Sequence, residues 1–217
     1  MKLLSPSLPS ALSPISDLST LAAKCVENQE PLSGALVEHV QLTGADLSGL
    51  MLEGVRFLGC RLLECDCSRW ETTDVVFQDC DLSGSTFADG IWSRTALEDC
   101  RALGSDFSQC GLHHTAFRGC RLSYANFTAQ RVKGGLWSGC DLSQAVLSSC
   151  VWSAVAFRDC DLTGTRLFHT PLAGLDLTTC HLEGLVLSDG GEELRGVIVD
   201  RWQAGELARR LGIVIRD

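Results

Sequence analysis

Apolar side chains recur at every fifth residue over most of the chain, from Leu32 to Leu187. Among these positions only Thr72 is polar, and a small side chain usually lies two residues earlier, as at Cys100 and Ser105. A period of five fits neither an α-helix, with 3.6 residues per turn, nor a strand, with two. The pattern indicates a repeat architecture, and because the register never slips, we expect no inserted loop between residues 32 and 187.

The cysteines show a second, longer period. Seven of them follow one another at intervals of twenty residues: Cys60, Cys80, Cys100, Cys120, Cys140, Cys160 and Cys180. Twenty residues are four pentapeptides, so the pattern predicts an all-β solenoid with four walls and four pentapeptides per coil. Successive coils should lie about 4.8 Å apart, which is the spacing of hydrogen-bonded strands. Inside such a tube, Phe57, Phe77 and Phe117 would belong to one stack.

The single repeats resemble those of the pentapeptide-repeat family, in which a small residue, Asp or Asn, Leu or Phe, Ser or Thr, and Gly follow one another. Good copies are Ala45–Gly49, Cys80–Gly84 and Cys160–Gly164. The resemblance implies a right-handed quadrilateral β-helix. Within the family, the chain is similar to the quinolone-resistance (Qnr-type) proteins, which bind DNA gyrase and topoisomerase IV. That narrower likeness lies in three stretches: Cys100–Phe107, Leu122–Phe127 and Gln203–Ile213.

The register divides the chain into three regions. Residues 1–31 precede it and are expected to cap the first coil, with Ser16 beginning a short helix that continues to about Glu27. Residues 32–190 form the repeat solenoid. Residues 191–217 are expected to be a strand and helix cap: residues 194–199 read as an extended piece, Asp200 as the start of a helix, and residues 213–215 as a short strand.

The C-terminal region also predicts an interface between two copies of the chain. A helix this short is marginal by itself and must pack on something. The resemblance implies a homodimer, because Qnr-like proteins are two-fold dimers through this tail, whereas the alternative is a cap alone. The expected interface comprises Trp202, Leu207, Leu211, Ile213, Val214 and Ile215.

The charge of the chain argues against nucleic acid as a direct ligand and favours either a basic partner or a role in solubility alone. The formal net charge is −9, and residues 32–106 alone carry 13 acidic and 5 basic side chains. Outward positions beside the cysteine stack form an acidic edge, which we take as the candidate partner-binding site: Asp79, Asp81, Asp99, Asp141, Asp159 and Asp161. Arg61, Arg101 and Arg121 fall in the same column. Duplex DNA carries one charge per about 1.7 Å, so the solenoid can mimic DNA only locally.

Trp70 departs from the pattern because it stands where a small residue is expected, between Cys67 and Thr72 at two core positions. We expect it to force a bulge or to turn outward, which would make it either a point of strain or a contact point for a partner.

The chemistry of the chain gives no indication of catalysis. Ten of the twelve cysteines fall on the small inward position, which predicts buried packing residues rather than disulfides. Zinc is the alternative, but Cys65 and Cys67 are the only close pair. The five histidines have no Cys or Ser partner at a motif spacing, and there is no glycine-rich phosphate loop. We therefore expect no enzyme activity, cofactor, metal or small-molecule substrate.

No segment approaches the ~18 consecutive apolar residues of a membrane span, and Pro6, Pro9 and Pro14 interrupt the N-terminal segment. This predicts a cytoplasmic protein without a membrane partner. Two functions then remain: a Qnr-like protein that binds a type II topoisomerase, and a repeat scaffold with another protein partner. Several Qnr-type proteins have two projecting loops that support drug protection. Here the matching stretches, Cys60–Cys67 and Phe117–Leu122, contain no insertion.

Overall fold

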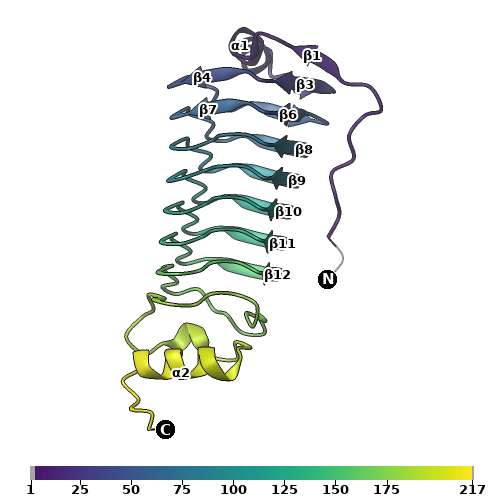
Figure 1. Cartoon of the computed structure of the whole chain (residues 1–217). Helices are drawn as coiled ribbons and strands as arrows, with labels where there is room; N and C mark the ends of the chain where they lie inside the picture. The colour runs from purple at the N-terminus through teal and green to yellow at the C-terminus, as the bar shows by residue number, and fades with distance from the viewer. Residues whose placement is uncertain (1–2, 217) are drawn as a thin grey trace.

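Parallel strands stack in successive coils along one axis, as Figure 1 shows. The coils repeat every twenty residues. The computed structural model describes residues 3–216. On the longest stretch of sheet, each residue pairs with the residue twenty positions later, so that Val76 lies beside Ala96 and Phe117 beside Trp137. The predicted all-β solenoid with a coil of twenty residues is confirmed.

In the middle coils, strands cover two of the four walls. In the middle of the solenoid one strand of eight residues bends around the corner between these walls: β8 (Glu71–Gln78), β9 (Ile91–Glu98), β10 (Gly111–Arg118), β11 (Arg131–Ser138) and β12 (Val151–Arg158). In the first coils the strands are shorter: β2 (Leu32–Ser33), β3 (Ala35–Glu38), β4 (Gln41–Thr43), β5 (Met51–Glu53), β6 (Arg56–Leu58) and β7 (Arg61–Leu63). In the middle coils the other two walls consist of turns joined by single bridges, such as Asp81 to Arg101.

Aromatic rings fill the inside of the tube in columns that follow its axis. The ring centroids of Phe57 and Phe77 lie 4.6 Å apart and nearly parallel, and those of Trp137 and Phe157 lie 5.0 Å apart. A second column, which contains Phe107, meets the first edge to face, with its ring 5.9 Å from that of Phe117. Both arrangements are favourable for aromatic pairs.

The small inward residues have a second role besides packing. The hydroxyl of Ser105 donates a hydrogen bond to the carbonyl of Leu82 at 2.8 Å, and that of Thr170 donates to Leu147 at 2.6 Å. The thiol of Cys110 makes the same contact with Phe87 at 3.1 Å. In each case the acceptor lies 23 residues earlier, on the preceding coil. A donor inside the tube thereby satisfies a carbonyl whose desolvation would otherwise be costly.

Trp70 lies inside the tube, so the expectation of an outward contact point is wrong. Its side chain is 0% exposed, and its indole N–H donates to the carbonyl of Leu47 at 2.6 Å, the bond that small donors make elsewhere. Room for the ring comes from the adjacent core positions, where Cys67 and Thr72 replace the usual Leu or Phe. The register continues past Trp70, with Thr72 paired with Leu52 and with Trp92, so the tube neither bulges nor breaks.

The N-terminal region adds a partial coil and a helix to the first full coil. β1 (Ser13–Ile15) pairs in parallel with β3, and α1 (Leu18–Asn28) covers the open end with Leu18 and Ala22 buried. The helix is capped by Asp17, whose carboxylate accepts the N–H of Thr20, and not by Ser16 as predicted. Residues 3–12 do not belong to this cap. They run down the outside of the strand stack (Figure 1).

The C-terminal region closes the other end with a 3-10 turn, η1 (Glu192–Leu194), and with α2 (Arg201–Arg210). Asp200 caps α2 as predicted, because its carboxylate accepts the N–H groups of Trp202 and Gln203. Two other expectations are wrong. Residues 194–199 form only a single bridge, from Ile198 to Asp176, and residues 213–215 form no strand in this single chain.

We expect Trp70→Ala to lower the free energy of unfolding by about 3–5 kcal/mol, because it leaves a cavity between two aromatic rings and removes the donor to Leu47. Urea denaturation followed by circular dichroism measures this. Tyr124→Ala is the control, since Tyr124 is an exposed aromatic on the same solenoid and its replacement should change stability by less than about 0.5 kcal/mol. Equal effects of the two substitutions would contradict the buried role of Trp70.

The buried cysteines should be chemically inert in the folded protein. All twelve are free thiols, and burial raises the pKa of Cys110 to about 12 and that of Cys150 to about 11. Because the thiolate is the reactive form, we expect a disulfide reagent such as DTNB at pH 8 to label Cys25 first, the one thiol that is only half-buried. Cys25→Ser should remove this fast reaction, and unfolding in urea should release the rest. Rapid labelling of several thiols in the folded Cys25→Ser protein would contradict this.

Candidate functional site

The six predicted aspartates lie along one edge of the solenoid but differ in their surroundings. Asp79, Asp99 and Asp159, here called the corner aspartates, end their pentapeptides in the left-handed conformation, with φ of 54°, 53° and 51°. This conformation turns the chain around the corner, and all three side chains are exposed. Gly119 and Gly139 occupy the same corner in the coils between Asp99 and Asp159. The corner therefore presents two separate acidic patches, one at Asp79 and Asp99 and the other at Asp159, rather than a continuous stripe.

The other three, here called the turn aspartates, are partly used by the backbone. The carboxylates of Asp81, Asp141 and Asp161 each accept the N–H group two residues later, at 3.2, 2.9 and 2.9 Å. Such turns are a common structural use of aspartate. All three side chains are half-buried. Their carboxylates stabilise turns of the wall, and only the oxygen atoms that these hydrogen bonds leave free are available to a partner.

The surroundings of Asp141 in the wall change the pKa of its carboxyl group. Burial raises its pKa, but hydrogen bonds from Ser123 and Ser143 together with the nearby Arg121 lower it overall. The hydroxyl of Ser123 donates to Asp141 at 2.6 Å from the preceding coil. Asp141 is therefore ionised throughout the physiological range.

Basic residues interrupt the acidic edge, as the sequence indicated. In the column of the turn aspartates, single backbone β-bridges join Asp81 to Arg101, Arg101 to Arg121, and Arg121 to Asp141. The prediction missed Glu98, which precedes Asp99 and lies 3.4 Å from Arg118 in a half-exposed ion pair. Its outward position in the repeat could have identified it. On this edge, two exposed carboxylates on successive coils therefore lie at Asp79 and Asp99, beside the Glu98–Arg118 pair.

Helix α2 is fixed across the last coil by polar contacts and by one leucine. The side-chain amide of Gln203 donates to the carbonyls of Leu177 and Cys180, at 2.9 and 2.7 Å, and Arg210 donates to the carbonyl of Leu185. Leu207 is only 6% exposed and belongs to the core of the single chain. Its prediction as an interface residue is wrong, because the last coil already covers its side chain.

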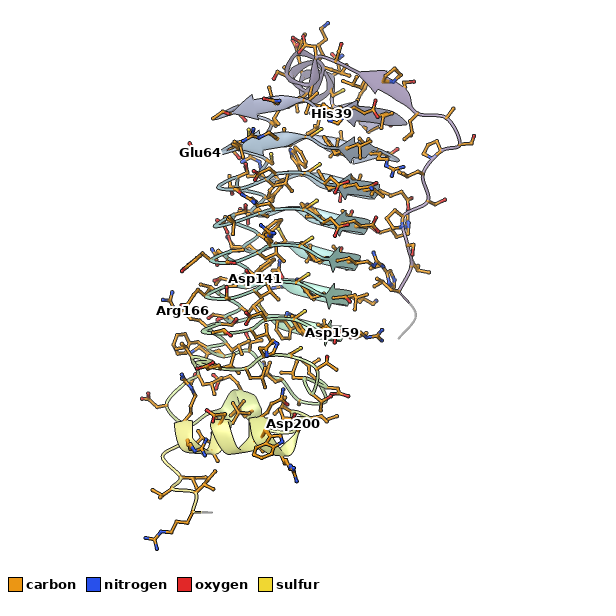
Figure 2. All side chains as sticks on the ribbon, in the orientation of Figure 1. His39, Glu64, Asp141, Asp159, Arg166 and Asp200 are labelled. Atoms are coloured by element: carbon orange, nitrogen blue, oxygen red, sulfur yellow. The ribbon has the colours of Figure 1, made fainter. Side chains whose placement is uncertain are left out.

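The remaining predicted interface residues form an exposed apolar surface at the C-terminal end. Val214 is 83% and Trp202 72% exposed, and Leu211, Ile213 and Ile215 are exposed as well. A groove of 880 Å³ separates α2 from the last coils and is lined by Asp161, His181, Trp202 and Ile215 among others. Figure 2 shows the side chain of Asp200 at the start of α2, beyond the last coil. This end could receive an apolar partner surface.

The side chains of residues 3–216 do not assemble a metal-binding cluster. In this part of the chain, no group of three or more His, Cys, Asp or Glu side chains could hold a metal ion. Cys65 and Cys67 are both buried in the tube. The helices within the same residues are too short or too polar to cross a membrane.

Comparison with known proteins supports the repeat assignment. Residues 70–134 match the model of a pentapeptide repeat region, and residues 32–69 and 137–172 match the model of pentapeptide repeats in eight copies. No curated protein sequence matches the chain.

Among solved structures, a trypsin-treated variant of QnrB1, a plasmid-mediated fluoroquinolone resistance protein, is 25% identical, with a TM-score of 0.53 over 95% of this chain and 97% of that chain. Full-length QnrB1 is 26% identical, with a TM-score of 0.38 over 94% and 97%. HetL, a pentapeptide repeat protein involved in heterocyst differentiation regulation in the cyanobacterium Nostoc, is 15% identical, with a TM-score of 0.41 over 82% and 96%.

Proposed function

The chain belongs to the pentapeptide-repeat family, and we propose that it binds a type II DNA topoisomerase, gyrase or topoisomerase IV, and alters its response to quinolones or to a toxin. The observation that carries this proposal is the similarity to the QnrB1 variant over nearly the full length of both chains. Resemblance of the repeats and of the C-terminal tail to Qnr-type proteins supports the same partner.

The acidic corner supplies the physical basis for this binding. A topoisomerase carries a basic surface where it holds DNA, and the exposed carboxylates of Asp79 and Asp99 offer that surface a local negative charge. Complementary charge of this kind raises the rate of association and orients the partners. Since Arg101 and Arg121 interrupt the edge, the mimicry of DNA is local, and the rest of the contact depends on the shape of the rod.

We further propose a homodimer through the C-terminal end. Trp202, Leu211, Ile213, Val214 and Ile215 form the exposed apolar surface there, and full burial of an apolar side chain of this size contributes about 1.5–3 kcal/mol. Two such ends that meet around a two-fold axis would cover both surfaces and the grooves beside α2. The dimer would then be a longer rod with an acidic corner on each half.

The unbroken register is relevant to whether the protein protects a topoisomerase from quinolones. The stretches where several Qnr-type proteins have projecting loops, Cys60–Cys67 and Phe117–Leu122, continue from coil to coil here without an insertion. We therefore propose that binding to the topoisomerase is retained and that protection from quinolones is weak.

A supercoiling assay with gyrase, in the presence and absence of ciprofloxacin, tests the proposed partner. We expect the protein to inhibit supercoiling at micromolar concentration. The variant with Asp79→Asn, Asp99→Asn and Asp159→Asn should need about tenfold more protein, which corresponds to about 1.4 kcal/mol. Asparagine tolerates the left-handed conformation, so the corners should remain intact.

A matched control removes the same net charge at other exposed positions, through Glu64→Gln, Asp89→Asn and Asp189→Asn. It should inhibit gyrase like the unaltered protein. If the unaltered protein has no effect on gyrase or topoisomerase IV at micromolar concentration, the topoisomerase proposal fails and a scaffold with another protein partner takes its place.

The dimer is tested by analytical ultracentrifugation. Val214→Asp should shift the protein to the monomer without changing its thermal midpoint by more than a few degrees, because Val214 contacts solvent in the single chain. Ile91→Asp, a change at an exposed apolar residue on the strand wall, should leave the dimer intact. Leu207→Asp should instead lower the stability of each chain. A Val214→Asp protein that sediments like the unaltered one would exclude this interface.

A further inference from the structure

An N-terminal arm, residues 3–12, lies along the outside of the strand wall, although nothing in the repeat requires it (Figure 1). Ser5, Pro6 and Leu8 line a hollow together with residues of the wall: Val76 and Ala96 are apolar, and Arg56, Glu98 and Arg118 are charged. Pro9 lies against Gly54, with its Cδ 2.8 Å from the place that a Cβ at Gly54 would take. A side chain at this glycine would push the arm away, so the wall leaves room for the arm.

The wall beneath the arm carries a column of mostly apolar side chains. One column of outward residues, here called the apolar column, is paired from coil to coil and interrupted only by Arg56: Leu36, Val76, Ala96, Ala116, Leu136 and Ala156. The corresponding column on the next wall holds Arg61, Asp81 and Arg101. A contiguous apolar column is unfavourable on a wall that faces water, whereas a segment that covers the column removes its side chains from water.

Few polar contacts hold the arm in place. The N–H of Ser7 donates to the carboxylate of Asp74 at 2.9 Å, and the N–H of Ser13, just after the arm, donates to the carbonyl of Gly34 at 2.8 Å. Asp74 is itself fixed by two hydrogen bonds from Arg94, at 2.7 and 2.6 Å, so its position does not depend on the arm. A segment with so few contacts opens more readily than the coils beneath it.

The composition of the arm shows which chemistry this wall accepts. Residues 3–16 carry no charged side chain, and Pro6 and Pro9 hold the arm extended without strand pairing. Pro6 and Leu8 are half-buried, whereas Ser7 and Pro9 between and after them are more exposed. The hollow beside them still measures 360 Å³, so the arm does not fill the groove.

We propose that the apolar column under the arm is a binding groove for an extended, uncharged segment of a partner protein that contains leucine and proline, and that the arm is a resident occupant which this segment displaces. Prolines lower the entropic cost of binding such a segment, because they restrict it to an extended form beforehand. The groove lies on the strand wall and extends to Glu98, next to Asp99 of the acidic corner, but it is remote from the C-terminal end. This interaction is therefore separate from the proposed dimer contact.

The test uses the full chain and a fluorescein-labelled peptide with the sequence of residues 3–15, LLSPSLPSALSPI. In the unaltered protein the arm competes with the peptide, and the apparent affinity falls by the fraction of time that the groove is open. Leu8→Asp should loosen the arm, and the peptide should then bind at least tenfold more tightly in fluorescence anisotropy. Ser10→Asp is the control, because it adds the same charge on the exposed side of the arm.

A second measurement locates the binding without altering the groove. A peptide with photo-reactive leucine at the position of Leu8 should crosslink to Val76 or Ala96 in the Leu8→Asp protein, whose thermal midpoint should match that of Ser10→Asp. Equal peptide affinity for Leu8→Asp and Ser10→Asp, or crosslinks elsewhere, would overturn the proposal. A large fall in the midpoint would identify the arm as a permanent brace. A Leu8→Asp protein that forms additional, concentration-dependent oligomers would assign the groove to the arm of a second copy.

Discussion

The structure depends on the hydrogen bonding of each coil to the next one at a constant offset of twenty residues. Parallel strands on two walls and single bridges on the other two carry these bonds, and inside the tube the small residues add a donor to a carbonyl 23 positions earlier. An inserted residue would move every later side chain to a different place in the wall. The chain therefore keeps its register over all coils, and its variation is confined to the chemistry of each position.

This constraint explains why the fold was predictable and where prediction ended. The period of five gives the inward positions, and the cysteine period gives the coil, because both follow directly from the bonding between coils. Trp70 was misread because a period records the class of residue at one position and not the volume shared by neighbours. Its small neighbours, Cys67 and Thr72, were the available signal. A Trp ring, a Cys thiol and a Ser or Thr hydroxyl can each occupy the small inward position, provided that the group donates a hydrogen bond to a carbonyl of the preceding coil.

The candidate site was predictable only in part, for a related reason. Spacing placed all six aspartates on one edge, but it could not separate Asp79, whose carboxylate is exposed, from Asp81, whose carboxylate accepts backbone N–H groups. Leu207 was predicted at the interface because helical spacing identifies an apolar face without showing what covers it. The arm was missed for the opposite reason, since residues 3–12 follow no period. Their absence of charge and their prolines indicate an extended segment only once the apolar column opposite them is known.

The rigidity of the tube also limits how its surfaces can influence one another. Closely packed coils have no second arrangement to adopt, so a partner at the acidic corner cannot transmit a change of shape through the core to the C-terminal end. Coupling between partners must arise from direct contact, from dimerisation that places two corners on one rod, or from a part that can leave the wall. The N-terminal arm is such a part, because its few polar contacts are small beside the bonding that joins the coils. A protein built as an inflexible rod can thus acquire a switchable surface without any movement of the rod itself.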